Sequence, residues 1–337
     1  MILRCPTPSE TPEWFEPPTL ADIDVARALI APHIIDTPSV PWPGYDLLAI
    51  LAPGVRVSAK LELLQRTGSF KARGALFNVL SLTEEQRACG ITAVSAGNHA
   101  IAAAWAAKMV GVSAKLVMMS SANQRRRDLT VSFGAEVVFA PSAQEAFAFA
   151  DRLVAEEHRV MIHPFEGRNT TLGTATIGVD FMRQVPDLDA VVVPIGGGGL
   201  IAGIASAIKL INPACAVFGV EPEGADSMHR SIIAGSPQPI EKVLTIADSL
   251  GAPYAMPYGF ECTRRNVDGL VLVSDDQLRD AMRLTFLDAK LGVEPAGAAA
   301  LAALVGPLRD ELAGKHVGII VCGSNIDTDT YVRHLTP

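Results

Sequence analysis

The amino-acid sequence predicts an α/β fold of two lobes, each with a mostly parallel, twisted β-sheet covered by helices. Strand-like and helical runs alternate along most of the 337 residues, a pattern typical of parallel sheets that are buried on both faces. This length is sufficient for a large core and for two lobes. Two strand-like runs, 91–94 and 190–195, also end in glycine-containing turns that open helices, which is where open α/β sheets bind ligands.

The first 86 residues contain few regular elements. Residues 1–18 are predicted to form an irregular arm, because prolines stand at positions 6, 8, 12, 17 and 18. Residues 19–31 read as an amphipathic helix that opens with the capping-box pair Thr19 and Asp22. A strand-like run over 55–64 follows, and a turn then leads into an apolar helical run over 75–80.

The middle of the chain shows the alternation in a short, regular form. We expect strands over 91–94, 114–119, 136–139 and 160–162, separated by helices over 97–110, 122–133 and 143–157. Such alternation predicts a parallel sheet. We therefore assign residues 87–164 to a small domain.

The elements after residue 164 are longer. We expect helices over 172–184, 200–211, 275–290 and 295–304, and strands over 190–195, 216–220, 270–273 and 317–321. The region 231–259 shows no clear periodicity and is predicted to be irregular. Residues 19–86 and 165–337 together are assigned to a large domain, which contains the second glycine turn and is expected to bind a cofactor.

Composition and charge exclude several classes of protein. A net charge of −8, from 28 Lys and Arg against 36 Asp and Glu, argues against nucleic-acid binding, and Arg125–Arg127 reads as a solvated helix face. No apolar run has the length of a membrane helix, and no signal-peptide pattern opens the chain, so we expect a cytoplasmic protein. The five cysteines are odd in number and widely spaced, which fits a reducing compartment.

Lys71 is the first candidate for chemistry. A lysine is usually a solvated cation with a long stem, but Lys71 lies beside Phe70 and between Gly68 and Gly74. These neighbours indicate a close-packed, apolar place, where loss of hydration lowers the pKa of the amine. A neutral amine can form an imine with an aldehyde.

Two turns complement this lysine. The turn over 95–100 and the glycine run 196–199 each precede an apolar helical run, so their backbone N–H groups can bind an anion at a helix N-terminus. A lysine for an aldehyde, one turn for a carboxylate and a glycine turn for a phosphate together describe a site for pyridoxal phosphate (PLP) and an amino acid.

Four stretches now carry a family resemblance. They are Ser-Phe-Lys-Ala-Arg-Gly-Ala at 69–75, Ser-Ala-Gly-Asn-His-Ala at 95–100, Val-Pro-Ile-Gly-Gly-Gly-Gly-Leu at 193–200 and Val-Cys-Gly-Ser-Asn at 321–325. In order and approximate spacing they resemble the threonine/serine dehydratases (ammonia-lyases) of fold type II among PLP enzymes, the tryptophan synthase β-like fold. The resemblance covers nearly all of the chain after Leu20. It implies the short catabolic type, without a regulatory domain, and a homodimer.

The resemblance also implies cofactor contacts. Lys71 would hold PLP as a Schiff base, be displaced by the substrate, and then remove the α-proton as general base. Asn98 would bind the phenolic oxygen, and Cys322 would lie beside the pyridine nitrogen, which a weak acid cannot keep protonated. The remaining cofactor-binding candidates are Phe70, Gly196, Gly197, Gly198 and Gly199.

The substrate is expected to be a β-hydroxy-α-amino acid, converted to a 2-oxo acid and ammonia. Ile101 and the run 172–177 replace amide side chains that many family members carry near the site. The side-chain specificity therefore stays open between threonine or serine and bulkier analogues such as phenylserine or 3-hydroxyaspartate. The residues expected to bind the substrate carboxylate are those of one turn: Ser95, Ala96, Gly97, Asn98 and His99.

A cation site is a weaker expectation. Glu221, Ala225 and Ser227 resemble a cation loop of serine racemase-like members, which use a carboxylate, a backbone carbonyl and a second carboxylate. Ser227 stands where the second carboxylate is expected, and the loss of one charged oxygen weakens a divalent site. Glu221 is alternatively only a charge at the end of a strand.

Two alternative functions remain open. An amino-acid racemase uses the same scaffold, but racemase-like members place a serine hydroxyl where this chain has Ala96. An NAD-dependent oxidoreductase is the alternative of another class, because Gly197-x-Gly199-x-x-Ala202 with Glu221 ending the next strand fits a dinucleotide fingerprint. That interpretation leaves Lys71 without a role.

Overall fold

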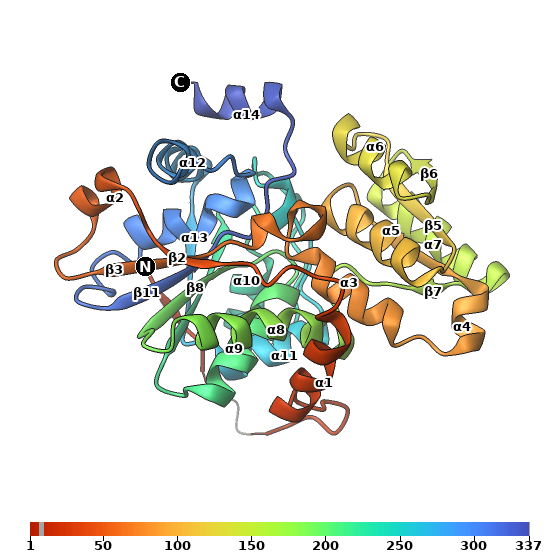
Figure 1. Cartoon of the computed structure of the whole chain (residues 1–337), viewed down its shortest axis with the longest axis horizontal. Helices are drawn as coiled ribbons and strands as arrows, with labels where there is room; N and C mark the ends of the chain where they lie inside the picture. The colour runs from red at the N-terminus through yellow and green to blue at the C-terminus, as the bar shows by residue number, and fades with distance from the viewer. Residues whose placement is uncertain (7–9, 337) are drawn as a thin grey trace.

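The structure, a computed structural model, describes residues 1–6 and 10–336. It contains two separate β-sheets covered by helices, which confirms the two-lobed α/β architecture (Figure 1). The larger sheet has the strand order β1-β10-β9-β8-β11-β3-β2, and the smaller sheet has the order β6-β5-β4-β7. In Figure 1 the smaller sheet and its helices lie to the right of the larger sheet.

The larger sheet is parallel in its interior. Its strands are β1 (Leu3–Arg4), β2 (Ser39–Pro41), β3 (Arg56–Lys60), β8 (Ala190–Pro194), β9 (Ala216–Pro222), β10 (Gly269–Val273) and β11 (His316–Ile320). The five inner strands run parallel, and only the edge strands β1 and β2 pair antiparallel. Every residue of β8 and β11 is buried, which explains why these strands read as continuous apolar runs in the sequence.

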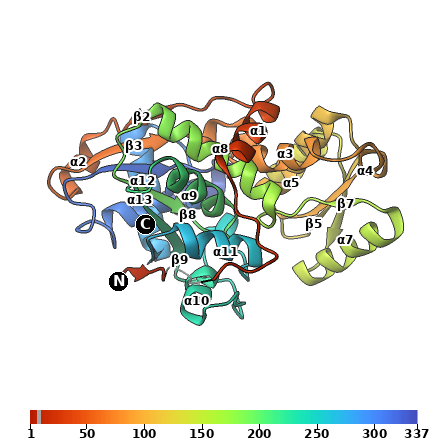
Figure 2. The same cartoon turned by 90° about the horizontal axis from the view of Figure 1, so that it is seen from below.

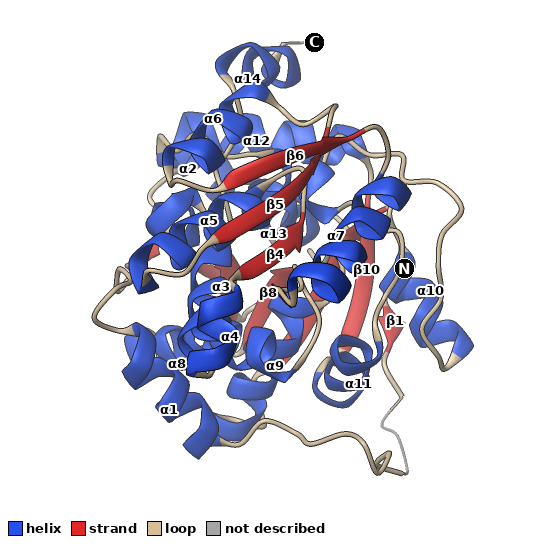
Figure 3. Cartoon of the chain, turned by 90° about the vertical axis from the view of Figure 1, so that its right-hand side faces the viewer, coloured by secondary structure: helices blue, strands red, loops and turns tan. Residues whose placement is uncertain are grey.

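The smaller sheet is wholly parallel, and Figure 3 shows its strands β4, β5 and β6 side by side. Its strands are β4 (Ile91–Val94), β5 (Ala114–Met119), β6 (Glu136–Ala140) and β7 (Val160–Met161). All four lie within residues 87–164, the segment that we propose as the small domain.

Fourteen α-helices are found in the described part of the chain. They are α1 (Leu20–Ile30), α2 (Tyr45–Ile50), α3 (Lys71–Leu80), α4 (Glu84–Cys89), α5 (Asn98–Val110), α6 (Gln124–Ser132), α7 (Ala143–Glu157), α8 (Arg168–Gln184), α9 (Gly199–Ile211), α10 (Ser227–Ala234), α11 (Pro257–Asn266), α12 (Asp275–Ala289), α13 (Pro295–Val305) and α14 (Thr328–Leu335). The capping box predicted at Thr19 is present at the start of α1. None of the helices in the described ranges has both the length and the apolar character that crossing a membrane requires.

Helices α8 and α9 pack closely beneath the larger sheet, side by side in Figure 2. Gly203 makes this possible, since a Cβ there would lie 2.2 Å from Thr174 Oγ1 and 2.5 Å from the backbone nitrogen of Ala175. The hydroxyl of Thr174 also donates to the carbonyl of Gly199 at 2.7 Å. The start of α9 is therefore fixed against α8.

Several boundaries differ from the sequence-based expectation. The strand expected over 55–64 ends at Lys60, because the N–H of Leu63 donates to Val321 and the chain turns into a short 3-10 helix, η1 (Glu62–Leu64). The region 231–259 contains the end of α10 and the start of α11, both too short for a clear periodic pattern. The predicted arm contributes β1, and its residues 7–9 lie outside the described residues.

Candidate active site

A cavity of about 230 Å³ is lined by residues from both lobes. The turn after β4, the turn between β8 and α9, and the end of β11 all face it, together with the first residue of α3. All of the cofactor and substrate candidates line this one cavity: Phe70, Lys71, Ser95, Ala96, Gly97, Asn98, His99, Gly196, Gly197, Gly198, Gly199 and Cys322.

Lys71 opens helix α3 and reaches into the cavity. Its Nζ donates to the carbonyl of Pro164 and lies 5.0 Å from the centroid of the Phe70 ring. Burial lowers the pKa of Lys71 to about 8, although Cys322 and Glu294 act in the opposite direction. Near pH 7 about a tenth of this amine is therefore neutral, and this neutral form can act as a nucleophile or a general base.

The glycine turn forms a cradle of backbone at the start of α9. Gly198 has φ +98°, a conformation that side chains rarely adopt. A Cβ on Gly197 would lie 2.2 Å from the Phe165 ring, and one on Gly199 would lie 2.6 Å from the Phe165 carbonyl oxygen. The first N–H groups of α9 have no acceptor within the helix, so they can bind the phosphate of PLP. The turn thus fits the cofactor that the resemblance implies.

The amide of Asn98 is held on both sides. Its Nδ2 donates to Glu294 Oε1 at 2.7 Å and to Ser249 Oγ at 3.3 Å, while its Oδ1 accepts from Asn325 Nδ2 at 2.7 Å. The contact with Ser249 is the longest of the three. The N–H that contacts Ser249 is therefore the one that can most easily donate to an oxygen of a bound cofactor instead.

Cys322 follows the end of β11 and is buried. Its carbonyl accepts from the N–H of Phe70 at 3.1 Å, which places it next to the segment that carries Lys71. Burial raises the pKa of the Cys322 thiol well above its ordinary value. The group is therefore a neutral thiol, as a weakly acidic partner of a pyridine nitrogen should be.

Substitution of Cys322 tests this position. Cys322→Ser is expected to keep turnover within about tenfold, because both side chains form weak, neutral hydrogen bonds that contribute about 1 kcal/mol. Cys322→Asp is expected to protonate the ring and increase side products such as those of transamination. Product chromatography measures this, and identical product ratios for the wild type and the Asp variant would place Cys322 outside the site.

His99 is buried as a neutral imidazole. Its Nε2 lies 2.8 Å from the carbonyl of Ile162, and because a carbonyl can only accept, this nitrogen carries the proton. Burial, with the nearby Lys71 charge, lowers the pKa of His99 to about 3. The ring is thus a fixed part of the cavity wall and adds no positive charge beside Lys71.

The interpretation of Arg125–Arg127 as a solvated face is wrong for Arg126. Its guanidinium is buried and donates to Asp248, to the carbonyl of Asn325 at 2.9 Å and to Glu294 Oε2 at 3.3 Å. Arg126 and Thr130 are the buried residues of α6, one helical turn apart. This i, i+4 spacing was the only local signal of a buried face.

Glu294 was also missed by the sequence analysis. It lies just before α13, lines the cavity, and is fully enclosed. Burial raises the pKa of Glu294 to about 7, although Arg126 acts to lower it. The only sequence signal was the Glu-Pro pair that opens a helix. Asp248 and Ser249, which line the same wall, come from the region predicted to be irregular.

The cation candidates lie elsewhere. The carboxylate of Glu221 accepts from the N–H groups of Met228 at 2.8 Å and His229 at 2.7 Å, so it caps α10. This use also argues against the dinucleotide interpretation, in which Glu221 binds a ribose. Within the described ranges no three His, Cys, Asp or Glu side chains are grouped to hold a metal ion. A cation site at Glu221, Ala225 and Ser227 stays a prediction.

Comparison with known proteins agrees with this geometry. The model of the family "Pyridoxal-phosphate dependent enzyme" matches residues 30–323. A phenylserine dehydratase from Ralstonia pickettii is 51% identical over 318 residues, 94% of this chain and 96% of the relative. An L-threonine ammonia-lyase from Thermotoga maritima is 38% identical over 83% of this chain and 70% of its own length.

Solved structures share the fold. Maize serine racemase superposes with a TM-score of 0.87 at 33% identity, covering 93% of this chain and 97% of its own. The processed form of threonine deaminase isoform 2 from Solanum lycopersicum gives a TM-score of 0.85 at 29% identity, covering 97% of this chain and 98% of its own. Both a racemase and a deaminase thus have this architecture, so the fold alone does not choose between the two reactions.

Proposed function

The chain belongs to the family of pyridoxal-phosphate dependent enzymes, and we propose that it dehydrates and deaminates a β-hydroxy-α-amino acid with an aromatic side chain. The products are a 2-oxo acid and ammonia. The observation that carries this proposal is the cavity itself, where Lys71, the glycine turn 196–199 and the turn 95–99 meet around an apolar wall.

The protein groups have separate tasks in this reaction. PLP supplies an electron sink for the α-carbon of the substrate when it is bound. Lys71 would hold the cofactor and take the α-proton of the substrate, a role for which its lowered pKa of about 8 is suited. The N–H groups at the start of α5, in the turn 95–99, orient the substrate carboxylate. The neutral thiol of Cys322 would lie beside the pyridine nitrogen and would not supply a strong acid to it.

An apolar wall of the cavity is available for the β-substituent. Met119 and Phe147 come from the small sheet and its helix α7. Leu250 ends the short 3-10 helix η3 (Asp248–Leu250), and Tyr254 lies between η3 and α11. Tyr254 also pairs with the cavity residue Phe165, with ring centroids 6.0 Å apart. Aromatic rings pack well in such a setting, whereas the methyl group of threonine would leave much of this wall without a contact. The identity to a phenylserine dehydratase supports the same choice.

A survey of substrates tests the proposal. The purified protein with PLP is expected to release 2-oxo acid and ammonia from phenylserine with a higher kcat/KM than from threonine, serine or 3-hydroxyaspartate. Phe147→Ala is expected to lower kcat/KM for phenylserine by roughly 10- to 100-fold, because burying a large apolar side chain contributes about 1.5–3 kcal/mol. Turnover of threonine by the same variant is the control and should change little. Absence of 2-oxo acid from all four substrates contradicts the proposal.

The racemase alternative can be separated from the dehydratase at Ala96. This residue lines the cavity, and its methyl group can neither give nor take a proton, so inversion of the α-carbon has no donor there. We expect 2-oxo acid from one α-configuration only, and Ala96→Ser should gain some racemase activity. Chiral chromatography after partial turnover measures both. Substantial opposite enantiomer from the unmodified protein would show that another residue supplies the second proton.

We also propose a cytoplasmic homodimer. All five cysteines are free, as is usual in a reducing compartment. Large apolar side chains are exposed on α2, α12 and α14, with Leu48, Phe286 and Val332 each about half exposed, and α12 packs against the other two helices. An apolar surface on adjoining helices is suited to a second copy of the chain.

A further inference from the structure

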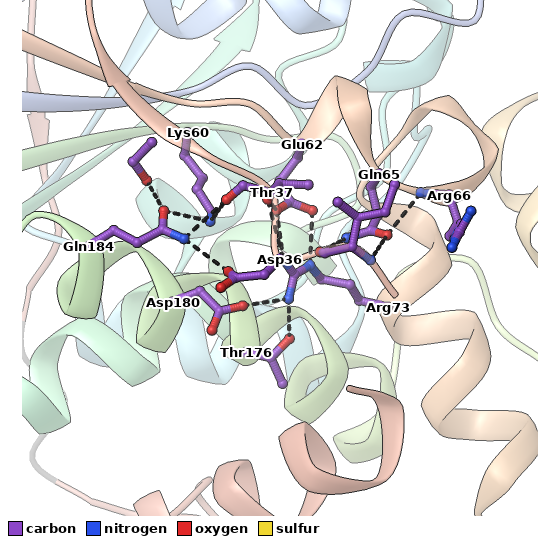
Figure 4. A network of polar contacts seen from close by, with 12 residues as sticks. Asp36, Thr37, Lys60, Glu62, Gln65, Arg66, Arg73, Thr176, Asp180 and Gln184 are labelled. Carbon is purple, nitrogen blue, oxygen red and sulfur yellow. Dashed lines mark hydrogen bonds and ion pairs between the residues drawn. The ribbon is translucent and has the colours of Figure 1, made fainter. Parts of the chain in front are cut away.

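A buried polar network lies behind the helix that carries Lys71 (Figure 4), and none of its side chains takes part in the proposed reaction. Arg73, two residues beyond Lys71 in α3, is at its centre and is fully buried. Figure 4 shows its guanidinium directed toward Glu62 on one side and toward Asp180 and Thr176 on the other. A buried arginine of this kind requires an explanation, because removing its charge from water is unfavourable unless each donor is satisfied.

Every N–H of this guanidinium has a partner. Nε and Nη2 donate to the two carboxylate oxygens of Glu62, both at 2.9 Å. Nη1 donates to Asp180 Oδ2 at 2.9 Å and to Thr176 Oγ1 at 3.1 Å. The second N–H of Nη2 faces Thr37 Oγ1 at 3.5 Å. Since arginine has five such donors in a rigid plane, these contacts fix both the position and the direction of α3 at Arg73.

Glu62, the first carboxylate partner of Arg73, is connected through the backbone to the cavity wall that contains Cys322. Glu62 opens the short helix η1, and the next residue, Leu63, donates its N–H to the carbonyl of Val321 at 2.8 Å. Val321 directly precedes Cys322. The two hydrogen bonds between Arg73 and Glu62 therefore join the segment that carries Lys71 to the end of β11.

The other partners of Arg73 lie on a helix that contacts the glycine turn. Asp180 and Thr176 lie on α8, the helix whose Thr174 hydroxyl donates to the carbonyl of Gly199 at 2.7 Å. One guanidinium thus connects three walls of the cavity: the base of Lys71, the turn 196–199 and the strand end at Cys322.

The buried charges of the network are balanced. Lys60 lies beside Arg73 and Glu62, and its Nζ donates to the carbonyl of Thr37 and, at 3.1 Å, to Gln184 Oε1. Two buried cations, Lys60 and Arg73, therefore accompany the two buried carboxylates of Glu62 and Asp180. Apolar side chains of similar volume often stabilise a core as well as such a set of charges. A gain in stability therefore does not explain why these charged groups are buried, whereas a need for fixed geometry does.

We propose that Arg73 is a positioning residue, which sets the distance and direction of Lys71 relative to the glycine turn and Cys322. PLP must be held at three places at once: at its aldehyde carbon, its phosphate and its ring nitrogen. The spacing of the three walls thus decides how well Lys71 is aligned with the bound cofactor. This proposal rests on the proposed function only in that the cofactor is PLP and its lysine is Lys71.

Arg73→Lys tests the proposal, because lysine keeps the charge and loses the planar fork. The apoprotein of the variant is expected to bind PLP at least about tenfold more weakly, and borohydride should fix a smaller fraction of limiting PLP to Lys71. In the loaded enzyme kcat should fall by about 10- to 100-fold with a small change in KM, since a misplacement of about 1 Å can cost 100-fold.

Arg27→Lys is the matched control. Arg27 donates to the same carboxylate, Asp180, at 3.0 Å, but it lies on α1 and is partly exposed. The control should therefore leave PLP affinity, the trapped fraction and kcat within about twofold of the wild type, because lysine keeps the charge at this partly exposed position and Asp180 keeps its contact with Arg73. A loss of PLP affinity in Arg27→Lys equal to that in Arg73→Lys would contradict a specific role of Arg73.

The proposal is overturned if Arg73→Lys lowers only the melting temperature and leaves PLP affinity, the trapped fraction and kcat unchanged. If that variant does not fold, Thr176→Val removes a single neutral partner of Nη1 and should still weaken PLP binding several-fold; normal binding by a folded Thr176→Val protein would then contradict the proposal. PLP binding and trapping need no amino acid, so failure of phenylserine turnover in the wild type would refute the proposed function and leave this test intact.

Discussion

Lys71→Ala is expected to abolish nearly all turnover, by at least about a thousandfold, because one amine both attaches the cofactor and takes the α-proton. The variant should also lose the absorbance of the covalently attached cofactor, and borohydride should no longer fix PLP to the chain. Steady-state kinetics and absorbance spectra of the purified proteins measure these effects. A variant that keeps more than about a tenth of the activity would contradict the assignment.

Lys60 provides a demanding control for this experiment. Burial lowers the pKa of Lys60 to about 8, the same value as for Lys71. Its Nζ, however, donates to the carbonyl of Thr37 and to Gln184, in the network behind α3. Lys60→Met is therefore expected to lower stability while PLP remains attached to Lys71. Position in the cavity, and not the pKa alone, distinguishes the two lysines.

Gly197→Val is expected to weaken PLP binding by roughly 10- to 100-fold. A Cβ at this position would lie 2.2 Å from the Phe165 ring, so the turn or the ring must move, and overpacking of this kind costs about 1–3 kcal/mol. Titration of the apoprotein with PLP measures the affinity.

Gly292→Val is the matched control, since Gly292 is exposed and a Cβ there would lie 4.0 Å from Tyr331. It should leave PLP affinity close to that of the wild type. Unchanged PLP affinity in a folded Gly197→Val protein would count against phosphate binding by this turn.

Local patterns predicted the regular elements well. The strands over 91–94 and 114–119 and the helix over 143–157 have the predicted bounds, because each is an apolar or amphipathic run with turn residues at its ends. Lys71, the glycine turn and Cys322 could also be found locally, since each lies in a short motif at a junction of a strand and a helix.

The pairing of polar side chains could not be predicted in this way. Arg126 meets Asp248 and Glu294 across 122 and 168 residues of sequence, and no local pattern records which distant groups share a buried wall. Short helices such as α10, α11 and α14 were missed because they offer only two or three turns of periodicity. Their formation depends on tertiary contacts more than on local propensity.

The most direct test of the central claim is borohydride reduction of the purified protein with PLP, followed by mass spectrometry of its peptides. We expect the pyridoxyl group on the peptide that contains Lys71, and prior addition of phenylserine should lower the amount fixed there. A pyridoxyl group on another lysine, or a protein that fixes no PLP at all, would contradict it.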